Sequence, residues 1–198
     1  MIILSIFFFI TAILYSSVGF GGGSTYLVLL LIWDIPYYIF PIIALICNII
    51  VVTGSSFNYV RSGHHNLKLL IPFLIGSIPL AFLGGTLILN KEIFEILLFI
   101  VLTIAGSLLL LNNKSYEDKK IIIRKINSYV SILIGCILGL VSGIVGIGGG
   151  IFLSPILFLL KAEKPKIIAT TASLFILINS ISGILGQLTK NFLYNELI

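Results

Sequence analysis

A glycine-rich break occurs twice inside apolar sequence, and it restricts the folds open to this chain. The first copy is GFGGG at residues 19–23, and the second is GIGGG at residues 146–150. Each follows a long hydrophobic run and precedes a short one. Glycine destabilises a helix by about 1 kcal/mol relative to alanine. Four glycines in five residues therefore predict that one helix ends and another begins at each place.

The composition is that of a membrane protein. Of the 198 residues, 59% are hydrophobic and 10% are charged, and the mean hydropathy is +1.21. A soluble domain carries about 25% charged residues, so we predict an all-α polytopic membrane protein with the lipid bilayer as its surroundings. The net charge of +5 does not indicate nucleic-acid binding, because the charges lie in short loops between apolar runs. Cys47 and Cys136 each lie in an apolar run, which favours buried free thiols.

Segment lengths indicate two kinds of helix. Apolar runs of about 20 residues cross a bilayer, and we predict full spans at residues 35–59, 67–89, 93–111 and 167–188. Residues 24–33 and 151–160, which follow the glycine clusters, have ten residues each. At about 1.5 Å per residue they reach roughly half of the hydrocarbon core. We predict that each is the returning limb of a glycine-broken helical hairpin and starts near mid-depth.

The two halves of the sequence match in order. An offset of 127 maps the first glycine cluster onto the second, and an offset of 129 then maps Pro36 to Pro165, Thr53 to Ser182, Gly54 to Gly183, Asn58 to Gln187 and Arg61 to Lys190. This predicts a first repeat at residues 1–111, a polar cytoplasmic linker at 112–127 and a second, incomplete repeat at 128–198.

The basic residues predict the orientation. If both glycine-broken regions are hairpins, ten of the twelve basic residues share one side. They are Arg61, Lys68, Lys114, Lys119, Lys120, Arg124, Lys125, Lys161, Lys164 and Lys166. Only Lys91 and Lys190 lie opposite, whereas single crossings would give a split of eight to four. The positive-inside rule favours the hairpins. Three full spans then separate the hairpins, so the repeat is inverted, with the N-terminus outside and residues 112–127 in the cytoplasm.

The glycine turns predict an anion site. Non-helical backbone at membrane depth must be buried in protein or line a wet cavity, and a helix N-terminus attracts anions through its free N–H groups and dipole. Paired interruptions in two halves are typical of transporter substrate sites. The candidate substrate-binding residues are Gly21, Gly22, Gly23, Ser24, Thr25, Asn48, Gly148, Gly149, Gly150 and Asn179. The alternative is close helix packing, because several glycines are spaced GxxxG.

Other functions find little support. No Asp, Glu, Lys or Arg lies deep in a predicted span, which favours an anionic or neutral substrate over a cation. No nucleophile–base pair is visible, so we predict that the protein is not an enzyme. His64 and His65 are adjacent in a loop without a cluster of Cys or carboxylates, and we predict neither a metal site nor a cofactor.

The sequence VGFGGGSTYL (18–27), its echo GLVSGIVGIGGGIFLSPIL (139–157) and the following ATTASL (169–174) resemble the sulfite exporter TauE/SafE family, also called TSUP. The resemblance covers nearly the whole chain. It implies a multi-pass carrier in the plasma membrane of a prokaryote, associated with sulfite, sulfonates and other sulfur-containing organic anions. It also implies that residues 19–23 and 146–150 are functional.

One departure from that family leaves two interpretations open. Its members have two similar halves, whereas residues 67–111 have no counterpart after residue 191 here. The chain is either a secondary transporter of small anions or a truncated, non-transporting remnant or subunit that needs a partner chain. We expect residues 67–111 to cover the first half. The equivalent flanks of the second half would then face lipid, or they would be covered in a homo-oligomer or by a complementing chain.

The orientation is tested by cysteine labelling in intact cells. A cysteine at position 90 should react with an impermeant reagent, and one at position 113 should be protected, because the split of basic residues places these positions on opposite sides. Labelling at 113 with protection at 90 would overturn the orientation.

Overall fold

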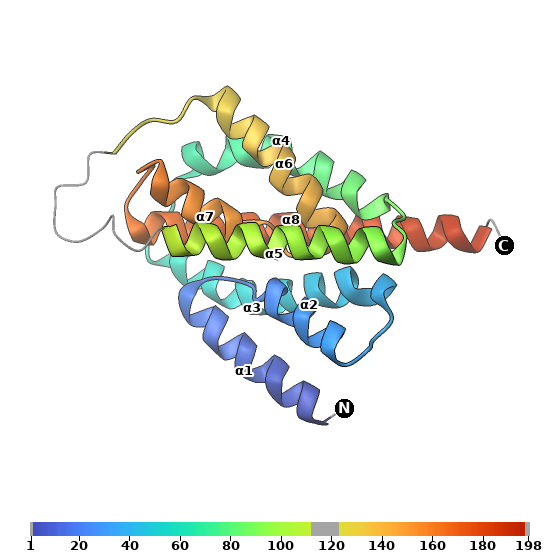
Figure 1. Ribbon diagram of the computed structural model, residues 1–198. Helices are drawn as coiled ribbons and strands as arrows, with labels where there is room; N and C mark the ends of the chain where they lie inside the picture. Colours follow the sequence, from blue (N-terminus) through green and yellow to red (C-terminus); the bar gives the residue numbers. More distant parts are fainter. Residues whose placement is uncertain (1, 112–122, 197–198) are drawn as a thin grey trace.

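The computed structural model describes residues 2–111 and 123–196, and its regular structure in these ranges is helical. Figure 1 shows the helices along the chain. The helices are α1 (Ile2–Val18), α2 (Gly23–Ile32), the short 3-10 helix η1 (Tyr37–Ile39), α3 (Phe40–Arg61), α4 (Leu67–Thr86), α5 (Lys91–Leu111), α6 (Ser128–Val145), α7 (Gly150–Leu159) and α8 (Pro165–Glu196). The predicted all-α membrane fold is confirmed.

Four of the described helical segments are long and apolar enough to cross a bilayer: Tyr37–Arg61, Leu67–Thr86, Ser128–Val145 and Pro165–Lys190. Three of them match predicted full spans, and the fourth predicted span forms α5, a helix of 21 residues. Both helices after the glycine clusters, α2 and α7, have ten residues. The predicted breaks are confirmed, because α1 and α6 end before the clusters and new helices begin within them.

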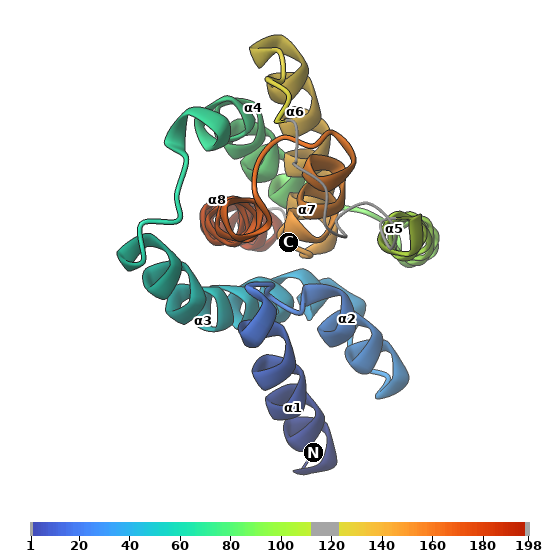
Figure 2. The same cartoon turned by 90° about the vertical axis from the view of Figure 1, so that its left-hand side faces the viewer.

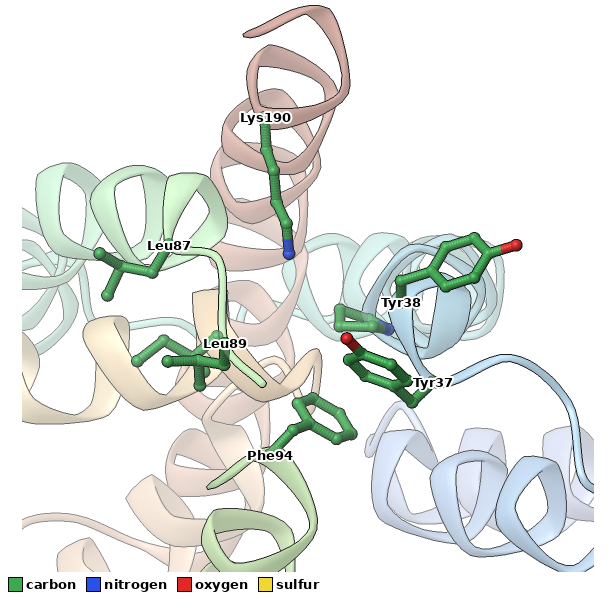
Figure 3. A pocket seen from close by; sticks show the side chains of 8 residues that line it. Tyr37, Tyr38, Leu87, Leu89, Phe94 and Lys190 are labelled. Carbon is green, nitrogen blue, oxygen red and sulfur yellow. The ribbon is translucent and has the colours of Figure 1, made fainter. Parts of the chain in front are cut away.

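The hairpins open toward opposite ends of the bundle. At one end, the Asn66 amide donates a 2.9 Å hydrogen bond to Glu163, and the Arg124 N–H donates a 3.0 Å bond to the Lys161 carbonyl. We call this the Glu163 end. At the other, the Lys190 end, a small pocket brings Lys190 together with residues 37–41 and 87–94 (Figure 3). Because α2 leads to the Lys190 end and α7 leads to the Glu163 end, the two short helices run in opposite directions.

Helix α4 packs against the second half of the chain. Its backbone lies against three glycines of α6, namely Gly135, Gly139 and Gly143. It also contacts α8, where the Ser182 hydroxyl donates a 2.7 Å hydrogen bond to the Ile78 carbonyl. The expectation that residues 67–89 cover the first half is therefore wrong. Glycines on both sides of the contact, including Gly76, Gly84 and Gly85 of α4, admit this close approach, and α4 therefore lies on the second half.

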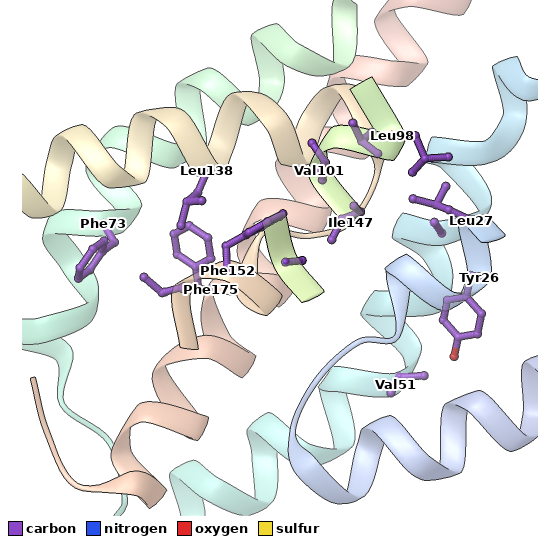
Figure 4. Close-up of a cluster of buried hydrophobic side chains, with 14 of the residues drawn as sticks. Tyr26, Leu27, Val51, Phe73, Leu98, Val101, Leu138, Ile147, Phe152 and Phe175 are labelled. Atoms are coloured by element: carbon purple, nitrogen blue, oxygen red, sulfur yellow. The ribbon is translucent and has the colours of Figure 1, made fainter. Parts of the chain in front are cut away.

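The two halves meet along α3 and α8. Ser55 and Ser56 of α3 both hydrogen-bond to Ser173 of α8, at 3.2 and 2.7 Å. The end view in Figure 2 places α1, α2 and α3 on one side and α4, α6, α7 and α8 on the other, with α5 at the edge beside α7. Buried apolar side chains from both halves, such as Leu27 and Phe152, belong to one cluster (Figure 4). This core holds the two glycine turns against each other.

Candidate substrate site between the glycine turns

The two glycine turns have the same left-handed backbone at two matched positions, and Gly148 is left-handed in the second turn alone. Gly22 precedes α2 with a φ of 80°, and Gly149 precedes α7 with a φ of 74°. Three residues earlier in each copy, Gly19 and Gly146 have φ angles of 84° and 89°. A left-handed conformation costs a residue with a Cβ about 1–2 kcal/mol. Glycines at these matched positions therefore allow the chain to leave one helix and begin the next.

The side chain of Asn48 lies between the two turns. It comes from near the middle of α3 and is completely buried. A Cβ atom added to Gly21, Gly23 or Gly148 would come within 3.0 Å of its amide atoms. Its Nδ2 also donates a long hydrogen bond, 3.4 Å, to the carbonyl of Gly146. One side chain thus contacts turns that are far apart in the sequence, and both short helices begin beside the middle of α3.

The turns carry backbone donors without a backbone partner. Within the described ranges, the N–H groups of Gly21, Gly22 and residues 147–149 donate to no backbone carbonyl. In the first turns of α2 and α7, the N–H groups of Gly23, Ser24, Gly150 and Ile151 also have no backbone acceptor, whereas those of Thr25 and Phe152 donate to the carbonyls of Gly22 and Gly149. Each helix N-terminus is equivalent to roughly half a positive charge. Two such ends beside Asn48 form an environment that favours an anion.

Three buried polar side-chain atoms surround the turns without a hydrogen-bond partner among the described residues. They are Oδ1 of Asn48, Oγ of Ser142 and Oγ of Ser180. A Cβ on Gly148 would lie 3.2 Å from the Ser180 hydroxyl, and one on Gly149 would lie 3.6 Å from Cβ of Ser142. Buried polar atoms in proteins are nearly always paired. These atoms are therefore available to a polar ligand, and the two serines extend the candidate site beyond the residues predicted from the sequence.

The remaining predicted residues lie in different surroundings. Ser24 lines the cavity between the turns, whereas the Thr25 hydroxyl is 2.8 Å from the hydroxyl of Tyr15. Gly150 packs against Ile176 of α8. Asn179 is buried, and its amide donates a 2.9 Å bond to the Phe175 carbonyl in its own helix. The structure thus brings the glycines, Asn48 and Ser24 together, and its described contacts do not join Asn179 to either turn.

The cavity between the turns is narrow. It has a volume of about 10 Å³, the size that holds a single water molecule. Its lining comes from both halves: Tyr15, Phe20, Gly21, Gly22, Gly23, Ser24, Ile147, Ile151 and Ile176. No acidic or basic side chain contributes to this lining. In the described part of the chain, no three His, Cys, Asp or Glu side chains are grouped so that they could hold a metal ion.

Glycine-broken hairpins that run in opposite directions and meet at the centre of a helical membrane bundle are typical of transporters. A family comparison agrees with this class. Residues 4–198 match the family described as sulfite exporter TauE/SafE. The chain belongs to this family of membrane transporters.

Individual relatives carry names of the same kind. A probable membrane transporter protein of Sinorhizobium fredii is 26% identical over 92% of this chain and 74% of its own length. One from Methanocaldococcus jannaschii is 32% identical over 94% of this chain and 73% of its own length. A third, from Haemophilus influenzae, is 42% identical over 29% of this chain and 21% of its own length. No solved structure matches the chain.

A double-mutant cycle tests whether Asn48 packs against the first turn. Gly21 is not left-handed, so alanine suits its backbone, but the added Cβ overlaps the Asn48 amide. We expect Gly21→Ala to destabilise the protein by about 1–3 kcal/mol, as overpacking does. Asn48→Ala removes Cγ and Oδ1, the two atoms that overlap most, so the double variant should lose less stability than the sum of the single changes.

Thermal unfolding in detergent measures the stability of the unchanged protein, the two single variants and the double variant. Gly106→Ala is the control, because a Cβ at Gly106 meets no atom within 4 Å. Additive losses in the double variant would contradict the contact between Asn48 and the first turn.

Proposed function

We propose that the protein is a secondary transporter of small anions, and that sulfite, sulfonates or related sulfur-containing organic anions are its substrates. The observation that carries this proposal is the meeting of two helix N-termini, of α2 and α7, beside one buried asparagine. The substrate would lie between Gly22 and Gly149. Backbone N–H groups would bind its oxygens, with Asn48, Ser24, Ser142 and Ser180 as additional partners.

The charge distribution supports an anion. The cavity lining is neutral, so the partial positive charge of the two helix ends is not cancelled by a carboxylate. Sulfite and sulfonates present several acceptor oxygens around one sulfur, which suits donors that converge from two directions. A cation would instead favour a carboxylate within the span.

The narrow cavity defines what transport would require. A space of about 10 Å³ is smaller than an anion of several heavy atoms, so the two turns must move apart to admit it. Helix α2 packs on α3 and α7 packs on α8. One moving unit would be the first hairpin with α3, and the other would be the second hairpin with α8. Rocking of these units against each other would open the site first toward one end of the bundle and then toward the other, as in other inverted-repeat carriers.

A second candidate function is that of a subunit that transports only with a partner chain. The observation that favours it is the exposure of Thr53 and Gly54 in the middle of α3, because small and polar residues on a membrane helix suit a protein neighbour. A polypeptide covering this surface would complete the bundle. In that case purified protein alone would bind the anion and would not transport it.

A charge substitution tests the proposed site. Asn48→Asp keeps the shape of the side chain and introduces a negative charge beside both helix N-termini, so we expect sulfite uptake into proteoliposomes to fall at least about tenfold. Asn58→Asp is the matched control, because Asn58 lies on the same helix and is exposed. Its uptake should stay close to that of the unchanged protein.

Binding measurements separate the two candidate functions. Sulfite binding without uptake would favour the subunit. Equal sulfite binding by the Asn48→Asp variant and the unchanged protein would contradict the anion site.

A further inference from the structure

We propose that Lys190 is the first residue to bind the anion at the Lys190 end of the bundle, before the anion reaches the glycine turns, and that the Tyr37 hydroxyl is a second donor at this point. This inference rests on the proposed transport of small anions. It adds to that function a charged contact outside the central site, which itself has no charged side chain in its lining.

The small pocket at this end contains the Lys190 side chain. Figure 3 shows the Lys190 ammonium and the Tyr37 hydroxyl pointing into the pocket, whereas the Tyr38 hydroxyl points away. Two donor groups, one of them charged, therefore face the same small space. The surrounding walls are mostly apolar and include Pro41, Phe94 and Ile144.

The pocket reaches the second glycine turn. A Cβ added to Gly146 would lie 2.5 Å from the Cα atom of Pro41, which lines the pocket. Ile144, two residues before Gly146, also lines the pocket, and Ile147, the next residue, lines the cavity between the turns. The contact between Pro41 and Gly146 thus lies at the boundary of the two spaces, and an anion held by Lys190 would be beside the second turn.

Helix α8 directs the lysine to this place. Gln187 is buried and donates a 3.0 Å hydrogen bond to the Gly143 carbonyl, near the end of α6. Residues three apart lie on the same face of a helix, so Lys190 faces the end of α6 and the turn that follows. A lysine near the end of a membrane helix commonly extends toward water, whereas this one is half-buried and directed into the pocket.

The charge of Lys190 has no acidic partner among the described residues. No carboxylate lines the pocket. Glu95, which follows the pocket residue Phe94, pairs instead with Lys91 at 3.8 Å. Water screens a partly buried charge less than an exposed one, and a charge that lines a cleft raises the local concentration of substrates of opposite sign. The free ammonium is therefore suited to attract an anion into the pocket.

The distribution of basic residues supports a functional role. Ten of the twelve are predicted on the opposite side of the membrane, so the positive-inside rule does not account for a lysine at this end. The 129-residue offset relates Lys190 to Arg61, which lies in the last turn of α3. The inverted repeat thus places one cation at each end of the two central helices, as a carrier that binds anions from both sides would need.

The kinetics of sulfite uptake into proteoliposomes test the role of Lys190. Lys190→Gln removes the charge and keeps much of the side-chain length, so KM should rise about tenfold while the maximal rate stays within about twofold. Lys190→Arg keeps the charge and should hold KM within about threefold of the unchanged protein. Lys91→Gln is the matched control, because Lys91 lies at the same end and its side chain is 67% exposed. It should change neither constant.

The outcomes separate this inference from the proposed function. Equal KM values for Lys190→Gln and Lys91→Gln, or a loss confined to the maximal rate, would overturn the role of Lys190 and leave the transport of sulfite standing. A KM for Lys190→Arg as high as that of Lys190→Gln would show that the charge is not what matters, and would also overturn it. Absence of sulfite uptake by the unchanged protein would contradict transport by this chain and overturn both.

Discussion

Backbone donors without acceptors, placed at the centre of an apolar bundle, are the constraint on which the rest of the structure depends. Two helices stop before Gly19 and Gly146, and two others begin at Gly23 and Gly150. In hydrocarbon each unpaired N–H group costs several kcal/mol. The turns must therefore be enclosed by protein, and the buried Asn48 amide stands where both turns meet.

This enclosure determines how the other helices are used. Helices α3 and α8 form the central pair, with serines in contact, and each supports one short helix. Helix α4 then closes the outer side of α6 and α8. The first half has no corresponding helix among the described residues, so the bundle is asymmetric around a nearly symmetric centre.

The sequence was sufficient for the parts of the fold that depend on local chemistry. Glycine clusters predict breaks because glycine adopts the left-handed angles without a steric cost, and ten-residue limbs predict half-membrane helices. The packing partner of α4 was predicted wrongly. Glycines in a sequence indicate that a helix has a close neighbour, but which helix that neighbour is depends on three-dimensional packing. Ser142 and Ser180 were not among the predicted binding residues, since a serine in a span usually bonds to its own helix. Asn48 was included for its polarity, but its contact with both turns is visible only in the structure.

The central claim is that the backbone amides of both turns bind one anion, and nuclear magnetic resonance of protein labelled with ¹⁵N-glycine tests it most directly. During titration with sulfite, the amide signals of Gly22, Gly23, Gly149 and Gly150 should shift together and saturate at one concentration. The signals of Gly54 and Gly106, which lie away from the turns, should stay in place. Shifts in only one turn, or equal shifts at Gly54 and Gly106, would contradict a shared anion site.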